Sequence, residues 1–232
     1  HRPSLAQWPE AEITSELARA EAAIERATGR RCRGFRGPGF SISKTLLQVL
    51  QRRGYAYDAS TFPTFIGPLA RAYYRSSVQN ESSGADERQN LYGTWRDGFR
   101  PLRPYQWWLD EGTLLEIPVT TFPVVRTPIH LTYLLHLSGL SRRIALQYFR
   151  AALRLCRLTG AWPSLLLHPL DFLGKDDVPE LAFFPGMKAS GEAKSEFVAE
   201  ILELYCRRFA VSPLEQCAAA VQTANALSVH RL

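Results

Sequence analysis

A chain of 232 residues can bury one sizeable core, and α/β barrels of this length commonly form a single domain. Its composition, 46% hydrophobic and 22% charged, is ordinary for a globular protein. The four cysteines have no metal-binding spacing and are too few for a disulfide scaffold, so we expect free thiols. The longest apolar stretch, at 131–140, is too short to span a bilayer. The net charge of +6 comes without a nucleic-acid-binding module, so we expect no nucleic-acid partner.

Helix and strand signals alternate in the first part of the chain. Apolar residues at helical spacing, capping serines and terminal glycines set the boundaries. The predicted elements are a helix that starts after Pro9 and stops at Gly29, a strand at 32–35, a helix from Ser41 or Ser43 to Gly54, and a strand at 55–60. Strands that alternate with helices favour parallel pairing, and the sequence therefore predicts an α/β fold.

Residues 61–113 form a long predicted insertion that is irregular and rich in aromatic side chains. Connections of this length are usually functional or disordered, and the aromatics of its second half argue against disorder there. Aromatic faces over an active site suit sugar rings, so we predict substrate contacts for Trp107 and Trp108. A satellite hydrophobic cluster is the alternative. The polar stretch 76–90 is expected to be a mobile excursion without chemistry.

A strand is predicted at 113–121, and helices follow to about residue 159. Glu116 interrupts the apolar pattern of this strand, where a carboxylate is costly to bury unless it is paired. Segment 141–157 combines an apolar stripe with several arginines. It either packs on the core with a solvated basic face, or lies against anionic lipid if the substrate is membrane-bound.

The segment "SLLLHPLDF" at 164–172 predicts a buried strand that ends at His168. Pro169 ends the strand because it lacks a backbone donor. In parallel α/β proteins the chemistry is built at the carboxyl ends of strands, so His168 is either a catalytic residue or a hydrogen-bonded structural one. A helix at about 188–208 and a strand at 209–213 complete the pattern.

Charged residues stand at the ends of several predicted strands. Arg36 follows one strand in a glycine- and proline-rich turn, where its guanidinium could hold a carboxylate. Asp58 ends the next strand, and Glu116 lies in a third. Together with His168 these residues would form a constellation suited to hydrolysis, although the spacing alone does not name the reaction.

Three segments carry a resemblance to a known family. Residues 1–41 look like a metal-binding histidine followed by Pro-x-Leu, a helix ending in "TG" and an "FR-x-P" turn. "LLQVLQRRGYAYDAS" at 46–60 is similar to the helix and "GY-x-YD-S" strand that come next, and "SLLLHPLDF" matches a leucine–histidine motif. In this order the segments resemble the polysaccharide deacetylases of the NodB-homology type, carbohydrate esterase family 4.

The resemblance implies a deformed (β/α) barrel, here a single catalytic domain over 1–232 that lacks its first strand or strands. It implies a divalent metal, most often zinc, and hydrolysis of an N-acetyl or similar acyl group on a sugar. By motif, His1 would be a metal ligand, Arg36 would orient the base carboxylate, and His168 would be the general acid. Leu166 would line the acyl pocket.

The family's aspartates and its other metal histidine would lie before residue 1, so we expect this chain by itself to be inactive. "LLEIPVTT" at 114–121 resembles family branches that act on envelope glycans or lipid-linked sugars, and leaves Glu116 open between a structural role, a partner of Arg36 and a substrate contact. We expect a bacterial envelope polysaccharide as substrate. The alternatives are deformylation or deacetylation of a lipid-linked sugar, with peripheral membrane contact, or a non-catalytic glycan-binding relative. A cytoplasmic or membrane-associated location is expected.

Overall fold

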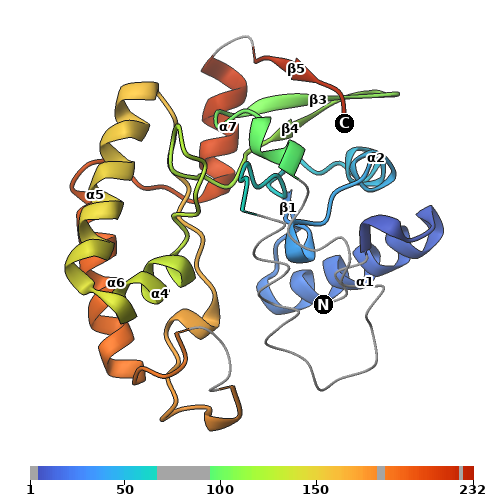
Figure 1. The fold of residues 1–232 in the computed structure, drawn as a ribbon. Helices are drawn as coiled ribbons and strands as arrows, with labels where there is room; N and C mark the ends of the chain where they lie inside the picture. Colours follow the sequence, from blue (N-terminus) through green and yellow to red (C-terminus); the bar gives the residue numbers. More distant parts are fainter. Residues whose placement is uncertain (1–4, 67–94, 182–185, 225–226) are drawn as a thin grey trace. The chain divides into compact units, whose positions relative to one another are not determined.

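The computed structural model describes residues 5–66, 95–181, 186–224 and 227–232. The chain divides into two compact units, one made of 1–118 and 213–232 and the other of 119–212. Each unit is described by itself (Figure 1). The single domain expected from the sequence stays a prediction.

The first unit is built on a five-stranded sheet whose strand order is β1-β2-β4-β3-β5. Neighbouring strands run parallel, except that β3 and β4 form an antiparallel hairpin. The strands are β1 (Gly34–Phe35), β2 (Tyr57–Asp58), β3 (Tyr105–Leu109), β4 (Gly112–Glu116) and β5 (Val229–His230). This mixed, mostly parallel sheet confirms the α/β class, whereas closure into a barrel stays a prediction.

Helices cover both faces of this sheet. Apolar residues of α1 (Glu10–Thr28) and α2 (Lys44–Arg52) pack against one face together with Trp107 and Leu114. Residues of α7 (Leu214–Ala224) pack against the other face, which carries Tyr57 and Leu115. Ser43 caps α2 by accepting a hydrogen bond from the Leu46 amide, and Gly29 ends α1 in the left-handed conformation, as the sequence predicts. Short 3-10 turns complete the unit: η1 (Leu5–Gln7), η2 (Pro38–Phe40) and η3 (Trp95–Phe99).

The second unit is helical among its described residues. Helices α4 (Leu131–Leu140), α5 (Arg142–Thr159) and α6 (Gly191–Cys206) share one core that includes Leu134, Phe149 and Ile201. Two 3-10 turns lie between α5 and α6, η4 (Pro169–Asp171) and η5 (Pro179–Leu181). All four cysteines are described and unpaired.

Several predicted strands differ from the structure. Residues 164–168 pair with no strand. Instead, the backbone carbonyl of Leu166 accepts a hydrogen bond from the Leu131 amide at the start of α4. Within this run Leu166 is buried and Leu165 packs against the helical core, whereas Leu167 is exposed, so a short apolar pattern alone did not identify the element. Residues 209–213 also form no strand, and the strand predicted at 113–121 ends at Glu116. The hairpin strand β3 lies within the insertion predicted to be irregular, and α7 and β5 were not predicted. The polar stretch 76–90 lies outside the described residues.

Candidate active site

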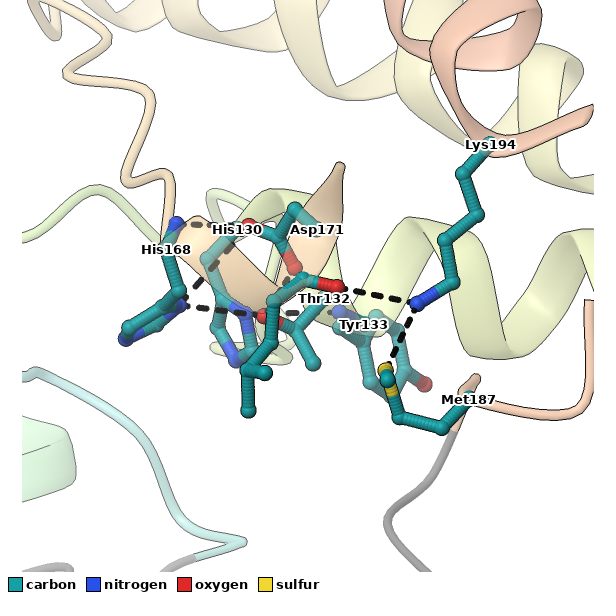
Figure 2. A network of polar contacts seen from close by, with 8 residues as sticks. His130, Thr132, Tyr133, His168, Asp171, Met187 and Lys194 are labelled. Carbon is teal, nitrogen blue, oxygen red and sulfur yellow. Dashed lines mark hydrogen bonds and ion pairs between the residues drawn. The ribbon is translucent and has the colours of Figure 1, made fainter. Parts of the chain in front are cut away.

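His168 opens the turn η4 and is held by Asp171, three residues later (Figure 2). Pro169 at the first position of the turn suits this geometry because it needs no amide donor there. The His168 backbone N–H donates to Oδ2 of Asp171 at 2.7 Å, and the same oxygen lies 3.8 Å from the imidazole Nδ1. Asp171 is buried, whereas half of the His168 side chain is exposed. A buried carboxylate therefore fixes an exposed imidazole.

Thr132 of α4 determines which ring nitrogen of His168 carries a proton. The Thr132 hydroxyl donates to Oδ1 of Asp171 at 2.7 Å and lies 3.1 Å from Nδ1 of His168. Because a hydroxyl has a single proton, it must accept the hydrogen bond from a protonated Nδ1. Burial alone would raise the pKa of Asp171, but hydrogen bonds from His168 and Thr132 lower it overall, so Asp171 is a carboxylate. The Nε2 atom, which points away from this network in Figure 2, is left as the reactive position.

Lys194 of α6 ties the turn to the helical core. Its side chain is buried, and Nζ donates to the carbonyls of Leu170 at 2.9 Å and Leu173 at 2.6 Å. The Met187 sulfur lies 3.1 Å away as a third, weak acceptor. Burial lowers the pKa of Lys194, and the nearby Asp171 opposes this shift. The backbone that carries His168 is therefore anchored on both sides, by Asp171 and by Lys194.

His130 is a second imidazole beside His168, with ring centroids 6.4 Å apart. Its Nδ1 accepts a hydrogen bond from the Tyr133 amide and caps α4. Burial, together with the charge that His168 carries when protonated, lowers the pKa of His130 to about 4. His130 is therefore neutral at physiological pH and serves as a cap.

Arg36 belongs to the first unit and lies in the turn that follows β1. Its Nε donates to the Ala59 carbonyl at 2.9 Å, and the next amide, of Gly37, donates to the Ser60 hydroxyl at 2.8 Å. A Cβ at position 37 would lie 2.1 Å from the Ser41 carbonyl oxygen, so this close turn requires glycine. Burial lowers the pKa of Arg36, and the negative charges of Asp58 and Glu116 oppose that shift. Arg36 is therefore a fixed cation at the end of β1, close to two buried carboxyl groups.

Asp58 and Glu116 occupy paired positions at the ends of β2 and β4, and both are buried. Glu116 accepts hydrogen bonds from the Thr61 amide at 2.9 Å and from the indole Nε1 of Trp107 at 2.8 Å. Asp58 accepts one from the Ser60 hydroxyl at 2.6 Å. Burial and the neighbouring Glu116 raise the pKa of Asp58 well above its usual range. Asp58 Oδ2 accepts no hydrogen bond from the described residues, as expected for the oxygen that carries the proton of a neutral carboxyl group.

Comparison with known protein families finds a match for the part of the chain that contains the Arg36 turn. Residues 1–57 match the polysaccharide deacetylase family. No curated protein and no solved structure matches the chain. The resemblance seen in the sequence is thereby confirmed over these residues, and His168 and Glu116 lie beyond the matched part.

The structure places the predicted polysaccharide deacetylase residues in two groups. Arg36 lies near Glu116 in the first unit, and Leu166 lies near His168 in the second. His1 lies outside the described residues. Among the described residues no group of three or more histidine, cysteine, aspartate or glutamate side chains could hold a metal.

Three of the four predicted substrate contacts are buried: Trp107, Glu116 and Leu166. The Trp107 ring is fully enclosed and bonded to Glu116, which is itself fully buried, so neither side chain offers a surface to a sugar in this structure. The indole N–H serves the carboxylate inside the core, and substrate contact by these two residues stays a prediction. Trp108, its neighbour on β3, is 55% exposed, and the Arg231 guanidinium lies over its ring, 6.0 Å from the centroid. Leu166 is buried beside α4.

Sequence reasoning missed Thr132, Asp171 and Lys194. Asp171 had a local signal. His168 is followed directly by Pro169, and an acidic residue three positions after the capping residue is typical of a capping box. Thr132 and Lys194 had none, since they are 36 and 26 positions from His168, and only the fold brings Thr132 to its ring and Lys194 to the carbonyls of Leu170 and Leu173.

Proposed function

We propose that this protein is a metal-dependent hydrolase that removes an N-acetyl or similar acyl group from a sugar of a bacterial envelope polysaccharide. The match of residues 1–57 to the polysaccharide deacetylase family carries the proposal. The network around His168 supports it, because a general acid needs a defined tautomer and an accessible nitrogen. The deformed barrel, the single domain and a cytoplasmic or membrane-associated location belong to the same proposal.

His168 acts in this proposal as the proton donor to the leaving nitrogen. The base carboxylate takes one proton from water, the hydroxide adds to the amide carbonyl carbon, the carbon–nitrogen bond breaks, and Nε2 of the imidazolium gives its proton to the departing amine. Nδ1 keeps its proton throughout, because Thr132 and Asp171 hold it. The acyl group leaves as the carboxylic acid, and His168 regains a proton from solvent.

The proposal also gives roles to Arg36, Leu166 and Trp108, each taken from the sequence. Arg36 orients the base carboxylate, Leu166 borders the acyl group, and the exposed Trp108 offers its ring to a sugar. The proposed metal is divalent, most often zinc in this family, with His1 as one ligand; it would polarise the carbonyl and activate water.

A lipid-linked sugar is a second candidate substrate. The exposed basic face of α5 favours it, since such a face suits a substrate held at an anionic membrane. No helix in the described part of the chain is long and apolar enough to cross a membrane. A non-catalytic glycan-binding relative is the remaining alternative.

Two assays on the full-length protein test the proposal. Elemental analysis after dialysis should find about one divalent ion per chain, as a mononuclear hydrolase requires. Acetate and formate release should then be compared on an N-acetylated polysaccharide and on an undecaprenyl-linked N-acyl sugar. Release from the polymer supports the first candidate, and release from the lipid-linked sugar alone supports the second. Glycan binding without metal or acid release would leave the non-catalytic alternative.

A further inference from the structure

Helix α5 carries an unusual stripe of arginines on its exposed side. Arg143, Arg150, Arg154 and Arg157 recur at spacings of three, four and seven residues and therefore lie on one face. Of the described residues, none forms an ion pair with any of the four, whereas Arg142 nearby is bonded to Glu200 of α6. The helix contains no acidic residue. The four positive charges therefore repel one another, and no acidic side chain of α5 offsets this repulsion.

Apolar side chains lie beside the arginines. Ile144 near the start of α5 is 62% exposed and Leu158 near its end is 81% exposed, and these two residues lie about 21 Å apart along the helix. Leu140, which precedes α5, and Trp162, which follows it, extend the apolar character at both ends. The opposite side of α5, with Phe149 and Leu153, packs into the core of its unit.

We infer that this face of α5 docks on an anionic lipid bilayer. An arginine stripe beside exposed aliphatic side chains is the pattern of a helix that lies in the membrane interface, with guanidinium groups at lipid phosphates and the aliphatic groups among the upper acyl chains. Nucleic acid fits less well, because no exposed aromatic side chain stands between the arginines and the neighbouring side chains are aliphatic. The inference goes beyond the proposed hydrolysis and does not depend on it.

Vesicle co-sedimentation of the whole 232-residue chain tests the inference. The chain should bind vesicles of phosphatidylcholine with phosphatidylglycerol and not vesicles of phosphatidylcholine alone, and binding should weaken with salt. The double variant R150Q/R154Q should bind roughly 25-fold more weakly, since each basic residue near an anionic surface contributes about fivefold. The variant R19Q/R26Q makes the same charge change on exposed positions of α1 and should bind like the wild type.

Vesicle binding at high salt tests the contribution of the aliphatic side chains. The variant I144Q/L158Q should lose the part of binding that persists at high salt, with an unchanged circular dichroism spectrum. Absence of vesicle binding would overturn the inference, and so would equal losses in R150Q/R154Q and R19Q/R26Q. Loss of binding to a double-stranded DNA fragment in R150Q/R154Q, with vesicle binding intact, would assign the stripe to nucleic acid instead.

Discussion

At the scale of single residues, one carboxylate organises the exposed histidine. Asp171 bonds to the backbone N–H of His168 and reaches its ring through Thr132, so one buried side chain fixes both the position and the tautomer of the imidazole. Such fixation matters only if Nε2 has a function, because an exposed structural histidine needs no particular tautomer.

Replacing His168 by alanine tests that function. His168→Ala should lower the turnover of the full-length enzyme by about 10²–10⁴-fold, the usual scale of general acid catalysis. The metal content should not change. His136→Ala, at an exposed position of α4, is the matched control and should leave turnover unchanged. Equal turnover of H168A and wild type would return His168 to a structural role.

Asp171→Asn tests the carboxylate itself through protein stability. The asparagine weakens two hydrogen bonds to a buried group, so the free energy of unfolding at pH 7 should fall by about 1–3 kcal/mol. Because the pKa of Asp171 is lowered on folding, its contribution is present above the ordinary carboxyl pKa and is lost as pH falls through the lowered value. The difference between variant and wild type in urea unfolding should therefore shrink towards pH 3. Glu196→Gln, an exposed control on α6, should show no such trend.

At the scale of elements, two buried carboxyl groups lie on neighbouring strands. Asp58 of β2 and Glu116 of β4 are held side by side at the carboxyl ends of parallel strands. Because the pKa of Asp58 is raised on folding, its stabilising protonation is complete below the ordinary carboxyl value of about 4 and is lost as pH rises through the raised value.

Asp58→Asn should remove this pH dependence. The amide keeps an acceptor for Ser60 and gains a permanent donor for Glu116. Relative to wild type, the variant should gain about 1.4 kcal/mol of unfolding free energy for each pH unit between the two pKa values. Urea unfolding at pH 5 and pH 8 measures this, and a difference that stays constant with pH would show that folding does not raise the pKa of Asp58.

Lys194 tests how α6 supports the turn η4. Lys194→Met leaves two backbone carbonyls without their donor and should lower the free energy of unfolding by about 1–3 kcal/mol. Lys188→Met, at an exposed position, is the control. Equal unfolding free energies for K194M and K188M would mean that water replaces the ammonium group.

Elements with their own boundary signals were predicted well, and elements that depend on distant partners were not. Pro9, Gly29 and Ser43 mark α1 and α2 in the sequence, and both helices form there. The three leucines before His168 form no strand, because only Leu166 is buried and Leu167 is exposed, and a short apolar run does not by itself define a strand. The same limit applied to the site: Asp171 was within local reach, whereas the burial of Trp107 depends on Glu116 across the hairpin.

At the scale of the whole molecule, the proposed function consists of one reaction, the hydrolysis of an N-acyl group on a sugar. The most direct test incubates the full-length protein with zinc and an N-acetylglucosamine polymer, and measures acetate and new free amines together. We expect equal amounts of acetate and free amine, because hydrolysis of one N-acetyl group releases one acetate and one amine. A folded protein that binds zinc and yet releases neither product, from the polymer or from a lipid-linked N-acyl sugar, would contradict the proposed function.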